Sequence, residues 1–193
     1  MGAPACSKGW KNCDLVRQYG SRGLAGSGKT TLIASYLDIR ALPCLWYQVD
    51  EGDEDIASFF YYLGLACKQA TPRRRTPLPL WSPDKARSLA NFSRNFFTEL
   101  WSHLPGTAVL VFANYQEADQ DSSLHEVIRA GIENTPENRR IMVVSRHDPP
   151  SSFARILANG GIAAIGWNEL QLTEDEAQNI VALRRPAAIS FGS

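Results

Sequence analysis

The sequence lacks the features that place a protein in a membrane or outside the cell. No apolar run approaches the roughly 20 residues that a membrane-spanning helix needs. The opening residues, MGAPACSKGWKNCD, contain no continuous apolar stretch of the kind found in a secretory signal. The four cysteines include no CxxC pair, which argues against a zinc site and fits a reducing compartment. We therefore expect a cytoplasmic protein with no membrane partner.

The chain also lacks an excess of charge of either sign. Twenty basic residues balance twenty acidic ones over 193 residues, so the net charge suggests neither a nucleic-acid nor a membrane partner. A local basic patch stays open, but the arginines of PRRR, residues 72–75, are interpreted as solvated residues of a proline-rich loop. The length and the 44% hydrophobic content fit one globular domain with a real core.

Buried strands alternate with helices along the chain, which predicts an α/β fold in which helices flank a mostly parallel sheet. Apolar runs rich in β-formers predict strands at 44–50, at 107–118 (running into a loop), at 139–150 and at 161–167. Helical spacing predicts helices at 30–40, 56–70, 84–104, 123–135, 152–160 and 172–185. The last of these follows a capping box formed by Thr173 and Glu176.

The stretch GLAGSGKT, residues 23–30, matches the phosphate-loop pattern GxxxxGK[ST]. Its glycines let the backbone wrap a phosphate closely, and inward-pointing N–H groups at a helix N-terminus form an anion nest. Lys29 is then expected to reach the β- and γ-phosphates, and the Thr30 hydroxyl to ligate Mg²⁺. The alternative is a chance glycine-rich turn before a helix. The predicted nucleotide-binding residues are Gly23, Gly26, Ser27, Gly28, Lys29, Thr30 and Thr31.

The residues before this loop fit the pattern poorly. A phosphate loop follows a buried apolar strand, yet CDLVRQYGSR offers only Leu15, Val16 and Tyr19 among polar residues. We expect either a short, poorly formed first strand or a replaced beginning, and both stay open. The predicted organisation is an irregular N-terminal segment at 1–22, a three-layer P-loop NTPase domain at 23–185 and a disordered tail at 186–193.

The second element of a phosphate-loop enzyme is an apolar strand that ends in a Mg²⁺-binding acid. The run from Val109 to Phe112 supplies the strand, but Ala113 occupies the acid position and Asn114 brings no charge. Glu117 is the nearest carboxylate, and it is either a partial catalytic substitute or a solvated loop residue. Because the acid is missing, we expect nucleotide binding to survive while hydrolysis is weak or absent.

The third strand ends in VVSRHDPP, on the side of the sheet where a phosphate would bind. Arg146 is a candidate catalytic residue that senses the γ-phosphate, with an ordinary surface salt bridge as the alternative. Asp50, at the end of an earlier strand, is a weaker candidate for contact with nucleotide or water.

No catalytic or metal-binding role is assigned to the remaining ionisable residues. The acidic loop at 50–55 is expected to form a solvated turn and a helix N-terminus rather than a metal site. His103 and His125 are expected at the surface, and the loop residue His147 is assigned no role.

Five segments, in this order and spacing, carry a family resemblance: GLAGSGKTTLIASYL, LWYQVDEGDEDIASFFYYL, AVLVFANYQEA, IMVVSRHDPPSSFARI and LQLTEDEAQNI. Over about residues 23–182 they resemble the ATPase domain of the large LuxR-type transcriptional regulators, STAND ATPases similar to the maltose-regulon activator. The resemblance implies an ATP- and Mg²⁺-binding switch in which nucleotide and an inducer drive self-association, while a separate C-terminal helix-turn-helix binds DNA.

By this resemblance Lys29 and Thr30 hold phosphate and Mg²⁺, Arg146 is the strand-end arginine, and Ala113 replaces an aspartate of the family. The choice of ATP over GTP rests on the resemblance, because no guanine-reading NKxD element is present. The chain stops before any DNA-reading segment, so it resembles a truncated, isolated sensor domain that does not bind DNA. The alternatives are an active ATPase or phosphotransferase that uses another acid, and a non-functional remnant.

Overall fold

A single parallel sheet organises the part of the chain that the computed structural model describes, which is residues 13–17, 29–74, 76–82 and 88–165. The strand order is β2-β3-β4-β1-β5, and every neighbouring pair is parallel. The strands are β1 at Cys13–Arg17, β2 at Cys44–Gln48, β3 at Val109–Ala113, β4 at Arg140–Ser145 and β5 at Ala163–Ile165.

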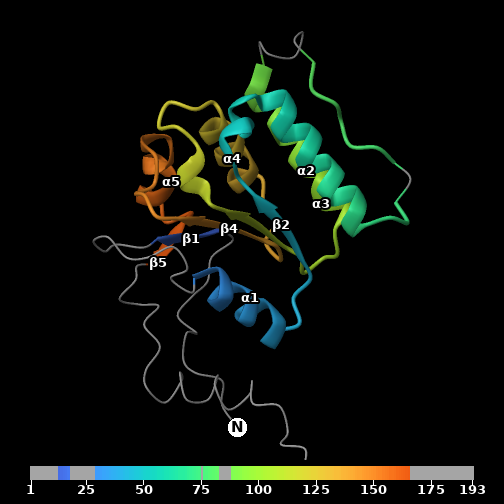
Figure 1. Ribbon diagram of the computed structural model, residues 1–193, viewed down its shortest axis with the longest axis horizontal. Helices are drawn as coiled ribbons and strands as arrows, with labels where there is room; N and C mark the ends of the chain where they lie inside the picture. The colour runs from blue at the N-terminus through green and yellow to red at the C-terminus, as the bar shows by residue number, and fades with distance from the viewer. Residues whose placement is uncertain (1–12, 18–28, 75, 83–87, 166–193) are drawn as a thin grey trace, which may run out of the picture.

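Helices cover both faces of this sheet. They are α1 at Lys29–Ile39, α2 at Ile56–Ala70, α3 at Leu89–His103, α4 at Leu124–Glu133 and α5 at Ala154–Ala158. Short 3-10 turns include η1 at Glu51–Glu54, η3 at Tyr115–Glu117 and η4 at Ser151–Phe153. Figure 1 shows α1 on one face and α2, α3 and α4 on the other. The predicted three-layer α/β fold is confirmed.

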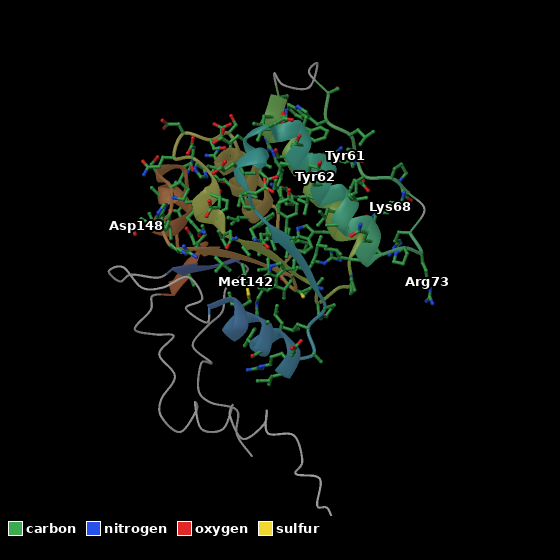
Figure 2. All side chains as sticks on the ribbon, viewed as in Figure 1. Tyr61, Tyr62, Lys68, Arg73, Met142 and Asp148 are labelled. Atoms are coloured by element: carbon green, nitrogen blue, oxygen red, sulfur yellow. The ribbon has the colours of Figure 1, made fainter. Side chains whose placement is uncertain are left out.

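Alternating residues of the central strands supply both layers of the core. On one face Leu110 and Phe112 of β3 pack with α2, α3 and α4 in a large cluster. On the other face Val111 and Met142 pack against Ile33 of α1 in a second cluster, and Figure 2 labels Met142 at the sheet above α1. Because the central strands are buried on both faces, they read as continuous apolar runs rather than as an alternating pattern.

Within the segment 1–22, expected to be irregular, a short first strand was one of the two alternatives, and the structure contains such a strand. Cys13–Arg17 forms β1, which lies between two partners: Leu15 is in register with Val143 of β4 and with Ala164 of β5. Backbone hydrogen bonds at both edges stabilise the strand even though its apolar pattern is weak. The domain therefore begins before residue 23. Residues 1–12 and 18–22 lie outside the described part.

The other predicted elements agree with the structure except at their ends. The helix predicted at 56–70 is α2, whose first turn is capped by the Asp55 carboxylate accepting from the N–H groups of Ala57 and Ser58. The strand predicted at 139–150 ends at Ser145. The helix predicted at 172–185 and the tail at 186–193 lie outside the described residues. In the part of the chain that is described, no helix has both the length and the apolar character needed to cross a bilayer.

The close approach of α3 and α4 gives a test of this core. A Cβ added to Gly131 of α4 would lie 2.7 Å from Cζ of Phe97, a fully buried ring of α3. A Cβ added to Gly64 of α2 would meet nothing nearer than Leu78 Cδ1 at 3.9 Å.

We predict that Gly131→Ala lowers the free energy of unfolding by about 1–2 kcal/mol, because overpacking outweighs the gain in helix propensity. The control Gly64→Ala should raise it by up to about 1 kcal/mol, since only the propensity changes there. Urea unfolding monitored by circular dichroism measures both. Equal stability of the two variants would show that α3 and α4 do not pack as described.

Candidate nucleotide-binding site

The candidate site lies where β1 and β4 end side by side. Arg17, the last residue of β1, is in register with Ser145, the last residue of β4. After β1 the chain passes through α1 to β2 at one edge of the sheet, whereas after β4 it passes to β5 at the other edge. Connections that diverge in this way leave a crevice at the carboxyl ends of the two strands, the usual ligand position in such sheets.

In the sequence, the predicted phosphate loop connects β1 to α1. Gly23, Gly26, Ser27 and Gly28 lie outside the described residues, whereas the backbone of Lys29, Thr30 and Thr31 forms the first turn of α1. A helix that connects two parallel strands runs opposite to them, so the N-terminus of α1 faces the carboxyl edge of the sheet. The strand and the helix that a phosphate loop requires are therefore both in place.

The structure brings the two predicted catalytic residues to the same corner through Gln116. The Arg146 backbone N–H donates to Gln116 Oε1 at 3.2 Å, and Gln116 Nε2 donates to Glu117 Oε1 at 3.0 Å. Arg146 and Glu117 are both exposed. Gln116 thus ties the loop after β3 to the loop after β4, and nothing in the sequence distinguished it from any other loop glutamine.

The acid position at the end of β3 carries a buried methyl group. Ala113 is 3% exposed, and its carbonyl oxygen accepts a hydrogen bond from the Val49 N–H at 2.9 Å. Asn114 follows in the left-handed region, with φ 57° and ψ 33°, which asparagine tolerates better than most residues. This turn leads into η3, so Glu117 lies in η3 and does not occupy the strand-end position.

A cavity of about 330 Å³ lies beside this corner. The loops after β3 and β4 line it, with Gln116, Ser145, His147 and Asp148 among the lining residues. The Ser145 hydroxyl accepts a hydrogen bond from the His147 N–H at 3.0 Å, which fixes the first turn after β4. Figure 2 shows Asp148 at the outer side of this loop.

A buried tyrosine–histidine pair, Tyr115 and His125, lines the cavity. The Tyr115 hydroxyl and His125 Nδ1 are hydrogen-bonded at 2.7 Å, and the Tyr115 ring stacks on Phe153. Burial lowers the pKa of His125, against the opposing effects of the Asp119 backbone and the Asp121 charge. Burial also raises the pKa of Tyr115. Both rings are therefore neutral at pH 7.

His125 and His103 were expected at the surface, and both are buried, at 5% and 8% exposed. The side of α4 that carries His125 faces η3 and η4 rather than solvent, with the Phe153 ring against the imidazole. His103 ends α3 and lines a groove beneath residues 76–80. Helical spacing alone did not reveal that these histidines are buried, because the residues that cover them come from distant turns and loops.

The acidic loop after β2 serves mainly to cap helices. Asp50 caps η1 by accepting from the Gly52 N–H at 2.8 Å, and Asp55 caps α2. Asp53 differs from the expected solvated turn: it is 3% exposed and accepts a 2.6 Å hydrogen bond from the Tyr47 hydroxyl. Burial raises the pKa of Asp53, although the Tyr47 hydrogen bond opposes this. Within the described ranges, no group of three or more His, Cys, Asp or Glu residues could hold a metal ion.

Together these features define a class: three-layer α/β proteins in which a phosphate-loop motif joins a central parallel strand to the following helix. No family model matches the chain. It is 30% identical over 169 residues to the HTH-type transcriptional regulator MalT of Yersinia enterocolitica, covering 87% of this chain and 18% of that protein. The same identity extends over 171 residues of the MalT protein of Yersinia pestis strain Pestoides F.

The chain is therefore similar to one segment of MalT regulators. The match covers 18% of the length of these relatives, so it relates this chain to part of each regulator and not to the whole.

The buried His125 gives this region a pH-dependent stability. Its pKa is lowered by folding, so as the pH falls below the ordinary histidine value of about 6.5 the unfolded chain binds a proton before the folded chain does. The contribution is complete above that pH and is lost as the pH falls. We predict that His125→Gln makes the free energy of unfolding fall less steeply between about pH 7 and pH 5.5.

Urea unfolding at several pH values measures this slope. The control is His147→Gln, which changes an exposed histidine on the neighbouring loop and should leave the slope as in the parent protein. If both variants behave alike, His125 is not the titrating group.

Proposed function

We propose that the chain is a cytoplasmic ATP-binding domain that holds the nucleotide at the end of β1 and hydrolyses it slowly or not at all. One observation supports this proposal most directly. β1 is a central strand whose carboxyl end adjoins that of β4, and the phosphate-loop sequence follows it and leads into α1. A chance glycine-rich turn would have no reason to occupy this position in the sheet.

The proposal assigns distinct tasks to the residues at this edge. The amides of the loop 23–28 and the N-terminus of α1 would bind the phosphates, with Lys29 reaching the β- and γ-phosphates and Thr30 ligating Mg²⁺. Arg146 follows Ser145, the register partner of Arg17, and this supports a role for Arg146 near the phosphates. Bound ATP supplies a γ-phosphate, the group that would distinguish two states of the domain.

Slow hydrolysis follows from the chemistry at the end of β3. A carboxylate there would bind the metal and orient the attacking water, and the Ala113 methyl group does neither. The loop is therefore suited to hold a nucleotide and to report its presence. The relatives are transcriptional regulators by name, and we propose that this chain is likewise a nucleotide-responsive, self-associating part of a regulatory system.

A second candidate function is an active ATPase or phosphotransferase. The observation that favours it is the Gln116 bridge, which brings Glu117 and Arg146 to one corner of the site. In that case Glu117 would replace the missing acid.

The phosphate loop is tested by Lys29→Ala. Charge-assisted hydrogen bonds contribute about 1.5–3 kcal/mol, so we predict an affinity for ATP about 10–100-fold lower. Calorimetric titration with ATP, ADP and GTP, with and without Mg²⁺, measures it. The control Lys68→Ala removes an equivalent charge from α2 and should bind ATP as the parent protein does. Unchanged ATP affinity in Lys29→Ala would refute the assignment of the loop.

The missing acid is tested by Ala113→Asp. We predict that it raises ATP turnover at least about tenfold, because it restores a ligand and an orienting group. Ala113→Asn has nearly the same size without the charge and should not raise turnover. Glu117→Gln separates the two candidate functions, because it should abolish turnover only if Glu117 is the catalytic acid. Thermal unfolding of each variant confirms that the buried position accepts the change.

A further inference from the structure

A groove of about 290 Å³ lies between α2 and the segment that follows it, and we call it the α2 groove. Residues 76–80 form one wall, and Tyr61, Leu65 and Lys68 of α2 contribute to the other. Figure 1 shows the segment running back along α2, and Figure 2 places Tyr61 and Lys68 on the helix. The volume is close to the lower end of the roughly 300–1,000 Å³ found for small-molecule sites. The groove therefore suits a small ligand.

The wall opposite α2 is held in place, so the groove is already open without a ligand. Pro77 and Pro79 each fix a φ angle of the segment, which keeps it extended. Just beyond them Trp81 stacks on Phe60 of α2, with ring centroids 5.8 Å apart. On the helix side Gly64 leaves space, because a Cβ added there would meet no atom nearer than 3.9 Å.

The two ends of the α2 groove differ in chemistry. One end is aromatic, because Phe60 of α2 and Phe96 of α3 both line the groove and their ring centroids are 4.7 Å apart. Lys68 and His103 lie about two turns further along the same two helices. A ligand that fills the groove would therefore be apolar at one end and polar at the other.

The polar end carries positive charge. Lys68 and Arg74 both line it, and the described lining residues include no aspartate or glutamate. A turn in which the Arg74 N–H donates to the Thr71 carbonyl oxygen at 3.0 Å positions Arg74. The C-termini of α2 and α3 oppose these cations with about half a negative charge each. The Arg139 guanidinium offsets part of this, because it donates to carbonyl groups at the end of α3. This end of the groove thus favours an anion.

A buried histidine at this end lacks a hydrogen-bonding partner. His103 is 8% exposed and lines the α2 groove. Within the described part of the chain, no residue forms a hydrogen bond with its imidazole. A buried polar group without a partner is unfavourable, and native proteins contain few of them. An oxygen atom of a ligand in the groove would supply the missing partner.

We propose that the α2 groove binds a small amphipathic carboxylate. The apolar body of the ligand lies against Phe60 and Tyr61, and its carboxylate lies between Lys68 and Arg74 and accepts a hydrogen bond from His103. The proposal does not rest on nucleotide binding. The groove lies on the α2 side of the sheet, whereas the phosphate-loop sequence leads into α1 on the other side.

Three probes with the same apolar body test the choice of ligand: octanoate, octanol and octylammonium. Calorimetric titration of the full chain should give a dissociation constant of about 10 μM to 1 mM for octanoate, because a small apolar body and one charge-assisted contact provide modest affinity. Octanol should bind at least about tenfold more weakly, and octylammonium more weakly still. Equal binding of the three probes, or no binding of octanoate up to about 10 mM, would overturn the proposal.

Variants of the lining residues locate the bound octanoate. Lys68→Gln and His103→Leu should each lower its affinity about three- to tenfold, because each removes one contact to the carboxylate. Gly64→Leu should abolish binding, because the new side chain fills the groove. The matched control Arg94→Gln removes an exposed positive charge of α3 outside the groove and should bind octanoate as the parent protein does.

Circular dichroism verifies that each variant is folded, and Lys68→Gln changes only an exposed side chain, so it remains informative if a core variant does not fold. Unchanged affinity for octanoate in Lys68→Gln would contradict the proposed position of the carboxylate. Lys29→Ala should bind octanoate normally. Loss of octanoate binding in Lys29→Ala would instead place the anion at the phosphate loop and overturn the proposal, whereas loss of ATP binding alone would leave it intact.

Discussion

The pairing of β1 with strands on both sides is the constraint on which the candidate site depends. Its register with β4 sets Arg17 beside Ser145. On its other side β1 pairs with β5, the last strand of the sheet. Because a phosphate loop takes its position from the strand that precedes it, this pairing decides where Lys29 and the N-terminus of α1 stand. Arg146 is a candidate site residue only because of this register, which brings the end of β4 beside the end of β1. Without it, an arginine after a strand end is an ordinary surface residue.

Both faces of the sheet contribute to the buried core of the described residues. On the α2–α4 side the large buried side chains include Trp101, Phe96 and Phe112. On the α1 side Ile33 and Leu37 meet the sheet. The central strands are therefore packed on both faces.

The sequence revealed elements whose signal lies in their own side chains and missed those that depend on distant partners. The apolar runs predicted β3 and β4, and the spacing in 56–70 predicted α2 to its ends. The sequence left β1 open, as a short strand or a replaced beginning, because backbone pairing on two sides and not apolar content stabilises it. The sequence did not single out Gln116, and it predicted His125 at the surface, because both are positioned by contacts with distant segments. Gln116 contacts Arg146, and His125 contacts Tyr115. The glycines of the motif predicted the loop chemistry, and the sheet order gives the candidate site its position at the ends of β1 and β4.

The proposal that this domain binds without hydrolysing is consistent with its electrostatics. Replacing a strand-end carboxylate by the Ala113 methyl group removes a negative charge that would repel a polyphosphate in the absence of metal, while Lys29 and Arg146 remain. Under this proposal, the absence of the acid would lower the rate of hydrolysis more than the affinity for nucleotide. It would also lower the dependence of binding on Mg²⁺, since the ion would not have to neutralise a protein carboxylate and the phosphates together. The state of the proposed site would then change through exchange of the ligand rather than through turnover.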